Sequence, residues 1–195
     1  MERTLPTTIK EYEEALKKER RKERDRRDYR MVLRSTICTL LSVAAIAILV
    51  ATLFLPVLQI YGTSMQPTLK DGDIVLSLKN AEFNRQDIIA FYYNNKILVK
   101  RVIANAGEWV DIDDEGNVTV NGSPLDEPYL IDKALGDSDI EYPYQVPDGR
   151  VFVMGDHRSI SVDSRSSTVG CVAEEQIVGK LTWRIWPMAD FGKIQ

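Results

Sequence analysis

Residues 35–69 read STICTLLSVAAIAILVATLFLPVLQIYGTSMQPTL and contain no charged side chain. The apolar centre, from Ile37 to Leu58, is longer than the ~20 residues that a helix needs to cross the hydrocarbon core of a bilayer. Pro56 should end or kink this helix, because proline has no backbone N–H to continue the hydrogen-bond pattern. Ser64 follows in a turn bounded by glycine and proline. The stretch therefore predicts a membrane helix with a serine hydroxyl close to its end.

Charged residues are distributed unevenly on the two sides of this segment. The chain has 195 residues and a formal net charge of −4. Residues 1–34 hold 12 Lys or Arg against 8 Asp or Glu, whereas residues 35–195 hold 13 against 21. Basic residues that flank a membrane helix favour the cytoplasmic side. We therefore expect a cytoplasmic, charged helical tail over 1–34, a transmembrane anchor over 35–60 and an extracytoplasmic domain over 61–195.

The tail and the apolar segment each have an alternative interpretation. A basic tail can bind nucleic acid, but acidic residues are interleaved with the basic ones here, so we expect no nucleic-acid partner. A cleaved signal peptide has a shorter basic leader and a shorter apolar core than this chain. Thr8 and Glu11 fit a capping box, and the tail is therefore expected to form a solvated helix near the lipid headgroups.

The pattern after Ser64 changes from helical to strand-like. Runs of β-branched and aromatic residues are separated by turn residues such as Asn94-Asn95 and Asn121-Gly122. We expect a long loop over 132–150 and a single helical turn over 174–176. Seven strands are expected, over 73–78, 87–93, 96–103, 109–112, 117–120, 150–154 and 179–185. The segment beyond the anchor is therefore predicted to be one mainly β domain.

Lys100 is a candidate base for Ser64, because a serine hydroxyl is a weak nucleophile without one. Leu98, Lys100 and Val102 share one face of the expected strand. Burial among apolar side chains lowers the pKa of a lysine, and a neutral amine could then take the Ser64 proton. The alternative is an ordinary strand lysine whose ammonium group stays in water.

His157 is the only histidine, so any Ser-His-Asp triad must use it, with Asp156 or Asp163 as the carboxylate. Asp156 is a poor partner, because adjacent residues of an extended segment point to opposite faces. A single histidine also excludes a zinc site of the His-Glu-x-x-His kind. The two cysteines, Cys38 and Cys171, imply no disulfide framework. We expect no metal and no cofactor.

Three motifs with polar and charged residues follow one another along the chain. They are Ser64-Met65 with Pro67-Thr68-Leu69, Lys100-Arg101 followed by Gly107-Glu108, and Gly155-Asp156-x-Arg158 with Ser161, Asp163, Ser164 and Arg165. In this order they resemble the boxes of bacterial type I signal peptidases. The resemblance covers roughly residues 32–190, and the single anchor and compact size are similar to the Gram-positive form. Taken alone, the third motif could also be a polar surface loop with local turns and a structural ion pair.

The resemblance implies a membrane-bound serine endopeptidase that removes N-terminal signal peptides from translocated preproteins. Ser64 would be the nucleophile, Lys100 the general base and Ser161 the hydroxyl that orients the lysine amine. Two supporting polar pairs are implied as well, Asp163 with Arg165 and Arg101 with Asp156. Cleavage would follow small-x-small motifs at the outer membrane surface, where a serine just beyond the anchor would lie.

Two positions depart from the family pattern. In the Gram-negative form, a serine two residues before the nucleophile supplies the second oxyanion donor, beside the N–H of the nucleophile itself. Gly62 occupies that position here. Either a backbone group or Thr63 substitutes, or the oxyanion hole is weaker, which can cost about 10²–10³ in rate. The second departure is His157, where many relatives carry asparagine.

The resemblance also implies partners and a substrate pocket. The partners would be secretory preproteins, the lipid bilayer and the Sec translocation machinery. Small substrate side chains would fit shallow apolar pockets. The candidate wall residues are Met65, Ile74, Val75, Leu76 and Phe91. An ordinary role in the hydrophobic core is an equal alternative for them. Trp183, Ile185 and Trp186 could belong to the core or to an interfacial aromatic patch.

Three other functional classes make different demands on the sequence. A self-cleaving repressor of the SOS-response type uses a similar Ser/Lys pair but carries a DNA-binding helix-turn-helix and no membrane segment. A sortase needs a reactive cysteine near arginine and histidine, a setting that Cys171 lacks. In an anchored binding domain without enzymatic activity, Ser64 would be a simple turn residue.

Overall fold

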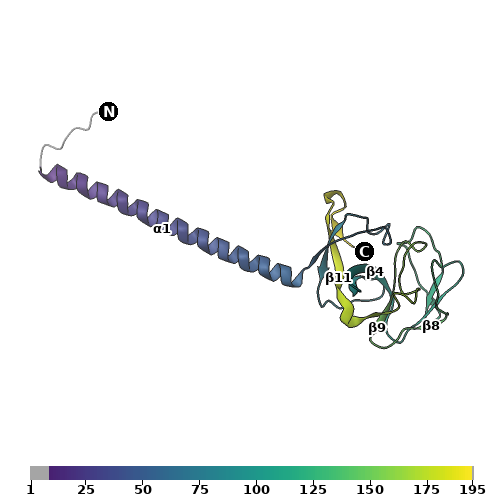
Figure 1. The fold of residues 1–195 in the computed structure, drawn as a ribbon. Coiled ribbons are helices and arrows are strands. Elements are labelled where there is room, and N and C mark those ends of the chain that lie inside the picture. The colour runs from purple at the N-terminus through teal and green to yellow at the C-terminus, as the bar shows by residue number, and fades with distance from the viewer. Residues whose placement is uncertain (1–8, 195) are drawn as a thin grey trace. The chain divides into compact units, whose positions relative to one another are not determined.

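A single helix dominates the first part of the chain. The computed structural model describes residues 9–194, so Thr8 of the expected capping box lies outside the described residues. Helix α1, Ile9–Phe54, is continuous (Figure 1). Among the described residues it is the one helix that is long and apolar enough to cross a membrane. It ends just before Pro56, as expected from the missing N–H of proline.

Hydroxyl groups inside α1 find partners within the helix itself. Thr36, Thr39 and Ser42 each donate to the carbonyl four residues earlier, at 2.9 Å. Such bonds satisfy polar groups where lipid offers no partner. By its internal contacts the chain divides after Val50 into two units.

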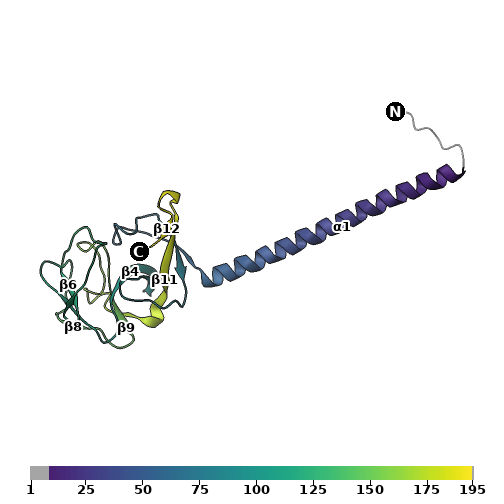
Figure 2. The ribbon, with the colours of Figure 1, turned by 180° about the vertical axis from the view of Figure 1, so that it is seen from behind.

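The second unit consists of two antiparallel sheets. The large sheet has the strand order β1-β2-β11-β3-β4-β9-β10, with β12 beside β11, and the small sheet has the order β7-β6-β5-β8. The strands are β1 Val57–Gln59, β2 Ile74–Leu78, β3 Ile88–Tyr93, β4 Lys96–Ala104, β5 Trp109–Ile112, β6 Val118–Val120, β7 Ser123–Pro124, β8 Tyr144–Gln145, β9 Arg150–Met154, β10 Val172–Ala173, β11 Ile177–Trp186 and β12 Gly192–Lys193. Two 3₁₀ turns complete the unit, η1 Glu174–Gln176 and η2 Met188–Asp190. The small sheet lies on the β9 side, away from β11, in both ribbon views (Figures 1 and 2).

The mainly β prediction is confirmed. All seven expected strands are present to within two residues at each end, and the expected helical turn is η1. Strands β1, β7, β8, β10 and β12 were not expected, because runs of two or three residues carry no readable alternation. Residues 57–59, expected at the end of the apolar anchor, form β1 and pair with β2.

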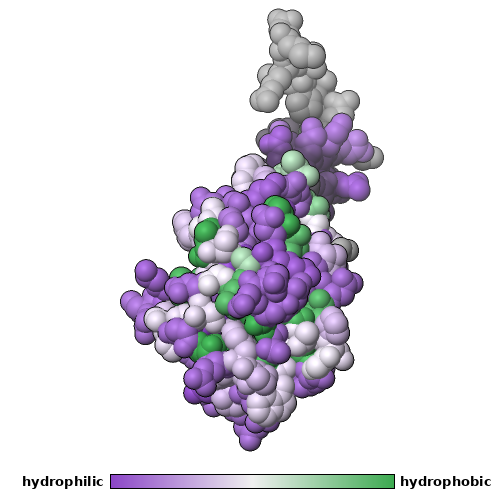
Figure 3. Space-filling view, turned by 90° about the vertical axis from the view of Figure 1, so that its right-hand side faces the viewer, coloured by the Kyte–Doolittle hydropathy of each residue, from purple (hydrophilic) through white to green (hydrophobic). Residues whose placement is uncertain are grey.

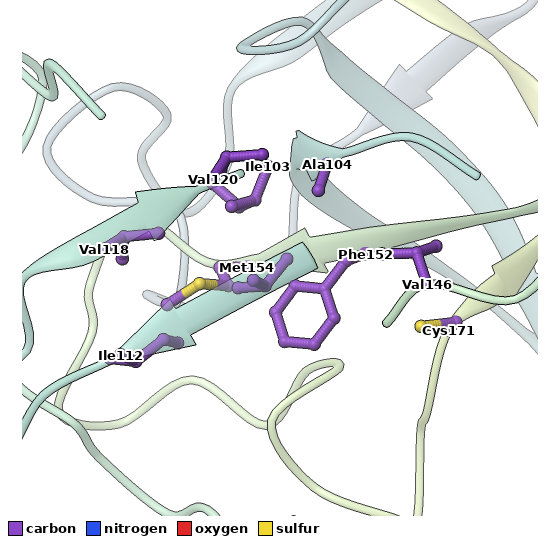
Figure 4. Close-up of a cluster of buried hydrophobic side chains, with 10 residues drawn as sticks. Ile103, Ala104, Ile112, Val118, Val120, Val146, Phe152, Met154 and Cys171 are labelled. Carbon is purple, nitrogen blue, oxygen red and sulfur yellow. The ribbon is translucent and has the colours of Figure 1, made fainter. Parts of the chain in front are cut away.

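Apolar side chains of the two sheets meet in a common core (Figure 4). This cluster includes Ile103 of β4, Phe152 and Met154 of β9, and Ile112 and Val118 of the small sheet. Burying each such side chain contributes about 1.5–3 kcal/mol to folding. Away from the core, the face of the domain in Figure 3 is mainly hydrophilic, with apolar side chains in small separate patches.

Candidate active site

Ser64 lies in the loop that joins β1 to β2. The Ile60 N–H donates to the Asp73 carbonyl at 2.8 Å, which closes the neck of the loop. Within the loop, Met65 and Leu69 are buried at 2% and 0% exposure. These two apolar anchors follow the nucleophile candidate in the loop and hold the backbone in place, so the half-buried Ser64 hydroxyl has a defined position.

Lys100 reaches Ser64 from the middle of β4. Its Nζ lies 2.7 Å from Ser64 Oγ and 3.0 Å from Ser161 Oγ. The lysine is 4% exposed and Ser161 is 1% exposed. The structure therefore brings together the three side chains that the sequence motifs placed in separate segments.

Burial lowers the pKa of Lys100 from 10.5 to about 8, because an ammonium group loses hydration in the protein interior. Nearby charges modify this effect: Asp163 and Asp156 raise the pKa, whereas Arg165 lowers it. With a pKa of about 8, roughly a tenth of the amine is neutral at pH 7. The side chain can therefore act as a proton acceptor under physiological conditions.

Behind Lys100 lies a buried ion pair. Arg165 donates from Nε and Nη2 to the two carboxylate oxygens of Asp163, at 2.8 and 2.9 Å. The Gly155 N–H also donates to Asp163, at 2.9 Å. Burial alone would raise the pKa of Asp163, but the hydrogen bonds and charge of Arg165, with the Gly155 amide, outweigh it and lower the pKa. This carboxylate is therefore ionised and held in one orientation.

A second ion pair ties β4 to the Ser64 loop. Arg101 donates from Nε and Nη2 to Asp156 at 2.8 and 2.7 Å, and both side chains are almost fully buried. Thr68, in the Ser64 loop, donates from its hydroxyl to the same Asp156 carboxylate at 2.5 Å. The backbone N–H of His157 donates to the Ser64 carbonyl at 3.0 Å. Strand β4, the Ser64 loop and the segment after β9 are thereby locked together.

The Ser64 N–H is available as an oxyanion donor, since it has no hydrogen-bond partner within residues 9–194. The N–H of Gly62 is engaged by Asp71 Oδ1 at 2.7 Å. Gly62 has φ +90°, a left-handed conformation that suits glycine. Thr63, one of the two groups expected from the sequence to supply the second oxyanion donor, is exposed next to Ser64.

His157 is not arranged as the base of a triad. Asp156 and Asp163 are each paired with an arginine. Within the described residues 9–194, no hydrogen bond joins the imidazole to Ser64 or to a carboxylate, and Nδ1 is buried without a partner. The contribution of His157 to the site is its backbone N–H.

We expect His157→Asn to keep kcat/KM for peptide cleavage within about threefold of the unchanged protein, because the backbone N–H that holds Ser64 is retained. The measurement is a steady-state cleavage assay on both proteins, with thermal unfolding as the control for folding. A loss of about 10²-fold or more, the size of a general-base contribution, would instead assign the base to His157.

An apolar cavity of about 510 Å³ adjoins the Ser64 and Lys100 side chains. Besides Met65, its walls come from β1 and β4 and their ends, and include Leu58, Ile60, Ile97, Leu98 and Val99. Of the expected wall residues, Met65 lines this cavity, and Ile74, Val75, Leu76 and Phe91 do not. Val75 and Phe91 are core residues at 0% and 1% exposure.

Part of the cavity wall could have been predicted from the sequence. Leu98 shares the expected strand face of Lys100, so it was a readable candidate for the wall. The wall residues of β1 could not be predicted, because in the sequence they continue the apolar run of the helix. Glu127 and Tyr129, which contact the arginines of the site, were also missed, because they lie in an irregular segment without a motif.

This chain is similar in sequence to proteins of one known family. A family model described as signal peptidase, peptidase S26, matches residues 33–186. The chain belongs to this family. It is 37% identical over 153 residues to signal peptidase IB of Staphylococcus aureus strain Mu50, which covers 68% of this chain and 78% of the relative.

Two further proteins are similar to this chain. Thylakoidal processing peptidase 1, chloroplastic, of Arabidopsis thaliana is 34% identical over 142 residues, which covers 64% of this chain and 40% of that relative. A solved structure of a signal peptidase I from Enterococcus faecalis V583 is 32% identical, with a TM-score of 0.43, and covers 52% of this chain and 98% of that chain.

Proposed function

We propose that this chain is a membrane-bound serine endopeptidase that removes N-terminal signal peptides from translocated preproteins. The observation that carries the proposal is the 2.7 Å contact between Lys100 Nζ and Ser64 Oγ in a buried setting. A lysine with a lowered pKa next to a serine is one recognised way to activate a hydroxyl. The family to which the chain belongs supports the same reaction.

The reaction would run in two halves. Neutral Lys100 takes the Ser64 proton while Oγ attacks the scissile carbonyl, and the Ser64 N–H donates to the oxyanion. The protonated lysine then gives its proton to the leaving amine, which leaves an ester on Ser64. A water molecule, deprotonated by the same lysine, hydrolyses the ester and restores the serine. Every proton transfer uses Lys100.

The surrounding residues have supporting roles in this proposal. Ser161 accepts a hydrogen bond from Lys100 Nζ at 3.0 Å and so directs the amine toward Ser64. The Asp163–Arg165 pair holds the backbone around Gly155, and the Arg101–Asp156 pair holds the Ser64 loop. Groups held this way reach the reacting geometry without a further ordering cost.

The cavity and the anchor define the substrate in this proposal. Small side chains before the scissile bond would enter the apolar cavity beside Ser64, which suits small-x-small motifs. The basic residues before the apolar helix favour a cytoplasmic N-terminus and a β domain on the outer side of the membrane. Ser64, ten residues beyond the end of α1, would then act near the membrane surface on secretory preproteins delivered by the Sec machinery.

The test is cleavage of a purified preprotein by the full-length chain in detergent. We expect the unchanged protein to release the mature protein at a small-x-small site, identified by mass spectrometry. Ser64→Ala should lower the rate by about 10³-fold or more, because the nucleophile is lost. Ser123→Ala, which removes an exposed serine hydroxyl in β7, is the matched control. Equal activity of Ser64→Ala and the unchanged protein would contradict the proposal.

A further inference from the structure

One irregular segment covers all three arginines of the site. Arg101, Arg158 and Arg165 are each at most 1% exposed, so each guanidinium needs partners inside the protein. In every case part of the partner set comes from residues 127–136, which we call the strap. The strap follows β7 and has no regular secondary structure.

The first contact is an ion pair between the strap and the third motif. Arg158 donates through Nη1 and Nη2 to both carboxylate oxygens of Glu127, and the two side chains are 1% exposed. The Tyr129 hydroxyl donates to the same carboxylate at 2.8 Å. Within residues 9–194, Glu127 is the one carboxylate that pairs with Arg158.

The other two arginines are covered by an aromatic ring and by backbone. The Tyr129 ring lies over Arg101, with 3.8 Å between Cζ and the ring centroid, which is cation–π geometry. Arg165 Nη1 donates to the Leu135 carbonyl at 2.6 Å. Gly136 has φ +68°, and a Cβ there would lie 2.6 Å from Arg165 Nη1, so glycine permits this close approach.

Arg158 connects the strap to the reacting groups. Its Nε donates to the Gly155 carbonyl at 3.1 Å. Gly155 is packed directly against the Ser161 side chain and the Ser64 carbonyl, since a Cβ at this position would collide with both. A displacement of Arg158 would therefore be passed through Gly155 to the hydroxyl that directs Lys100 and to the backbone of the nucleophile.

We propose that Glu127 is a positioning residue for the peptidase reaction, and that it acts by holding Arg158 and through it Gly155. This inference rests on the proposed function. If the Glu127 carboxylate is neutralised, the buried Arg158 guanidinium loses its counter-charge. It must then bind water molecules, or compete with the other arginines for the carboxylates of Asp156 and Asp163. Either outcome moves the loop that carries Ser161, and small displacements of reacting groups are costly in rate.

The experiment compares Glu127→Gln with Asp132→Asn in the full-length chain, using preprotein cleavage and thermal unfolding. Asp132 is an exposed carboxylate of the same strap, so the control removes the same charge. We expect Glu127→Gln to lower kcat by about 10–100-fold with KM within about threefold, in protein that remains folded at the assay temperature. Asp132→Asn should leave both constants unchanged.

A double-mutant cycle separates positioning from a general loss of stability. If Glu127 acts through Arg158, then Glu127→Gln combined with Arg158→Met should have the kcat of Arg158→Met alone, whereas independent effects would multiply. Multiplying effects, or a folded Glu127→Gln with unchanged kcat, would overturn the proposal.

If Glu127→Gln does not fold, Tyr129→Phe is the variant that decides, since it removes one hydrogen bond to the Glu127 carboxylate. A two- to fivefold lower kcat supports the proposal and an unchanged kcat contradicts it. An inactive unchanged protein would instead contradict the proposed function.

Discussion

Lys100→Met is expected to lower preprotein cleavage by about 10³-fold or more and, at the same time, to raise the thermal stability of the protein. The activity falls because no other base lies within hydrogen-bond distance of Ser64 among the described residues. The stability rises because the charged lysine is unfavourable in its buried site. A pKa lowered from 10.5 to about 8 corresponds to about 3 kcal/mol at pH values below 8, from which the lost hydrogen bonds to Ser64 and Ser161 subtract about 1–2 kcal/mol.

The pH dependence of this stability gain follows from the direction of the shift. The folded state of the unchanged protein binds fewer protons than the unfolded state between about pH 8 and 10.5. The penalty of the buried lysine is therefore fully present below pH 8 and disappears as the pH rises to 10.5. Lys100→Met should have the higher unfolding midpoint at pH 6, and this advantage should shrink above pH 8 and reverse by about pH 10.5, where only the lost hydrogen bonds remain. Lys79→Met, at an exposed lysine, is the control and should show no such pH-dependent difference in the unfolding midpoint. Cleavage by folded Lys100→Met at the rate of the unchanged protein would exclude Lys100 as the base.

Gly155→Ala is expected to reduce kcat by about 10²-fold, although it adds one methyl group. The new Cβ would lie 2.6 Å from the Ser64 carbonyl oxygen and 2.6 Å from Ser161 Cβ, so these groups must move. Overpacking of a buried site also costs about 1–3 kcal/mol in stability. Both reacting segments are displaced together, because Gly155 lies between them.

Gly192→Ala is the matched control for this change. A Cβ at Gly192 would meet nothing within 4 Å, so activity and the unfolding midpoint should stay close to those of the unchanged protein. Steady-state cleavage and thermal unfolding measured on both variants check the prediction. A Gly155→Ala protein with unchanged kcat would show that the packing around Gly155 does not set the geometry of the nucleophile.

The sequence predicted the parts of the fold that depend on local patterns. The charge-free apolar run predicted α1, and β-branched runs between turn residues predicted β3 paired with β4 and β5 paired with β6. The apolar neighbours of Lys100 in a strand made it a candidate base, with an ordinary strand lysine as the alternative, and the resemblance to signal peptidases selected it. These features are readable because each is encoded in one continuous stretch of sequence.

Other features depend on contacts between distant segments and could not be read locally. Alternation shows which residues share a strand face but not which face meets the cavity, so Val75 and Phe91 had the wall and the core as equal alternatives, and they belong to the core. The Glu127–Arg158 pair joins residues 31 positions apart through an irregular segment. The strap has no periodicity, and its role appears only when the arginines beneath it are seen.

The most direct measurement of the central claim is the pH dependence of kcat/KM for preprotein cleavage between pH 6 and 10, on protein shown to be folded throughout. If Lys100 is the base for Ser64, kcat/KM rises about tenfold per pH unit at low pH and levels off near pH 8, where the neutral amine becomes the main form. A profile that is flat from pH 6 to 10, in protein that cleaves its substrate, would contradict the assignment of Lys100.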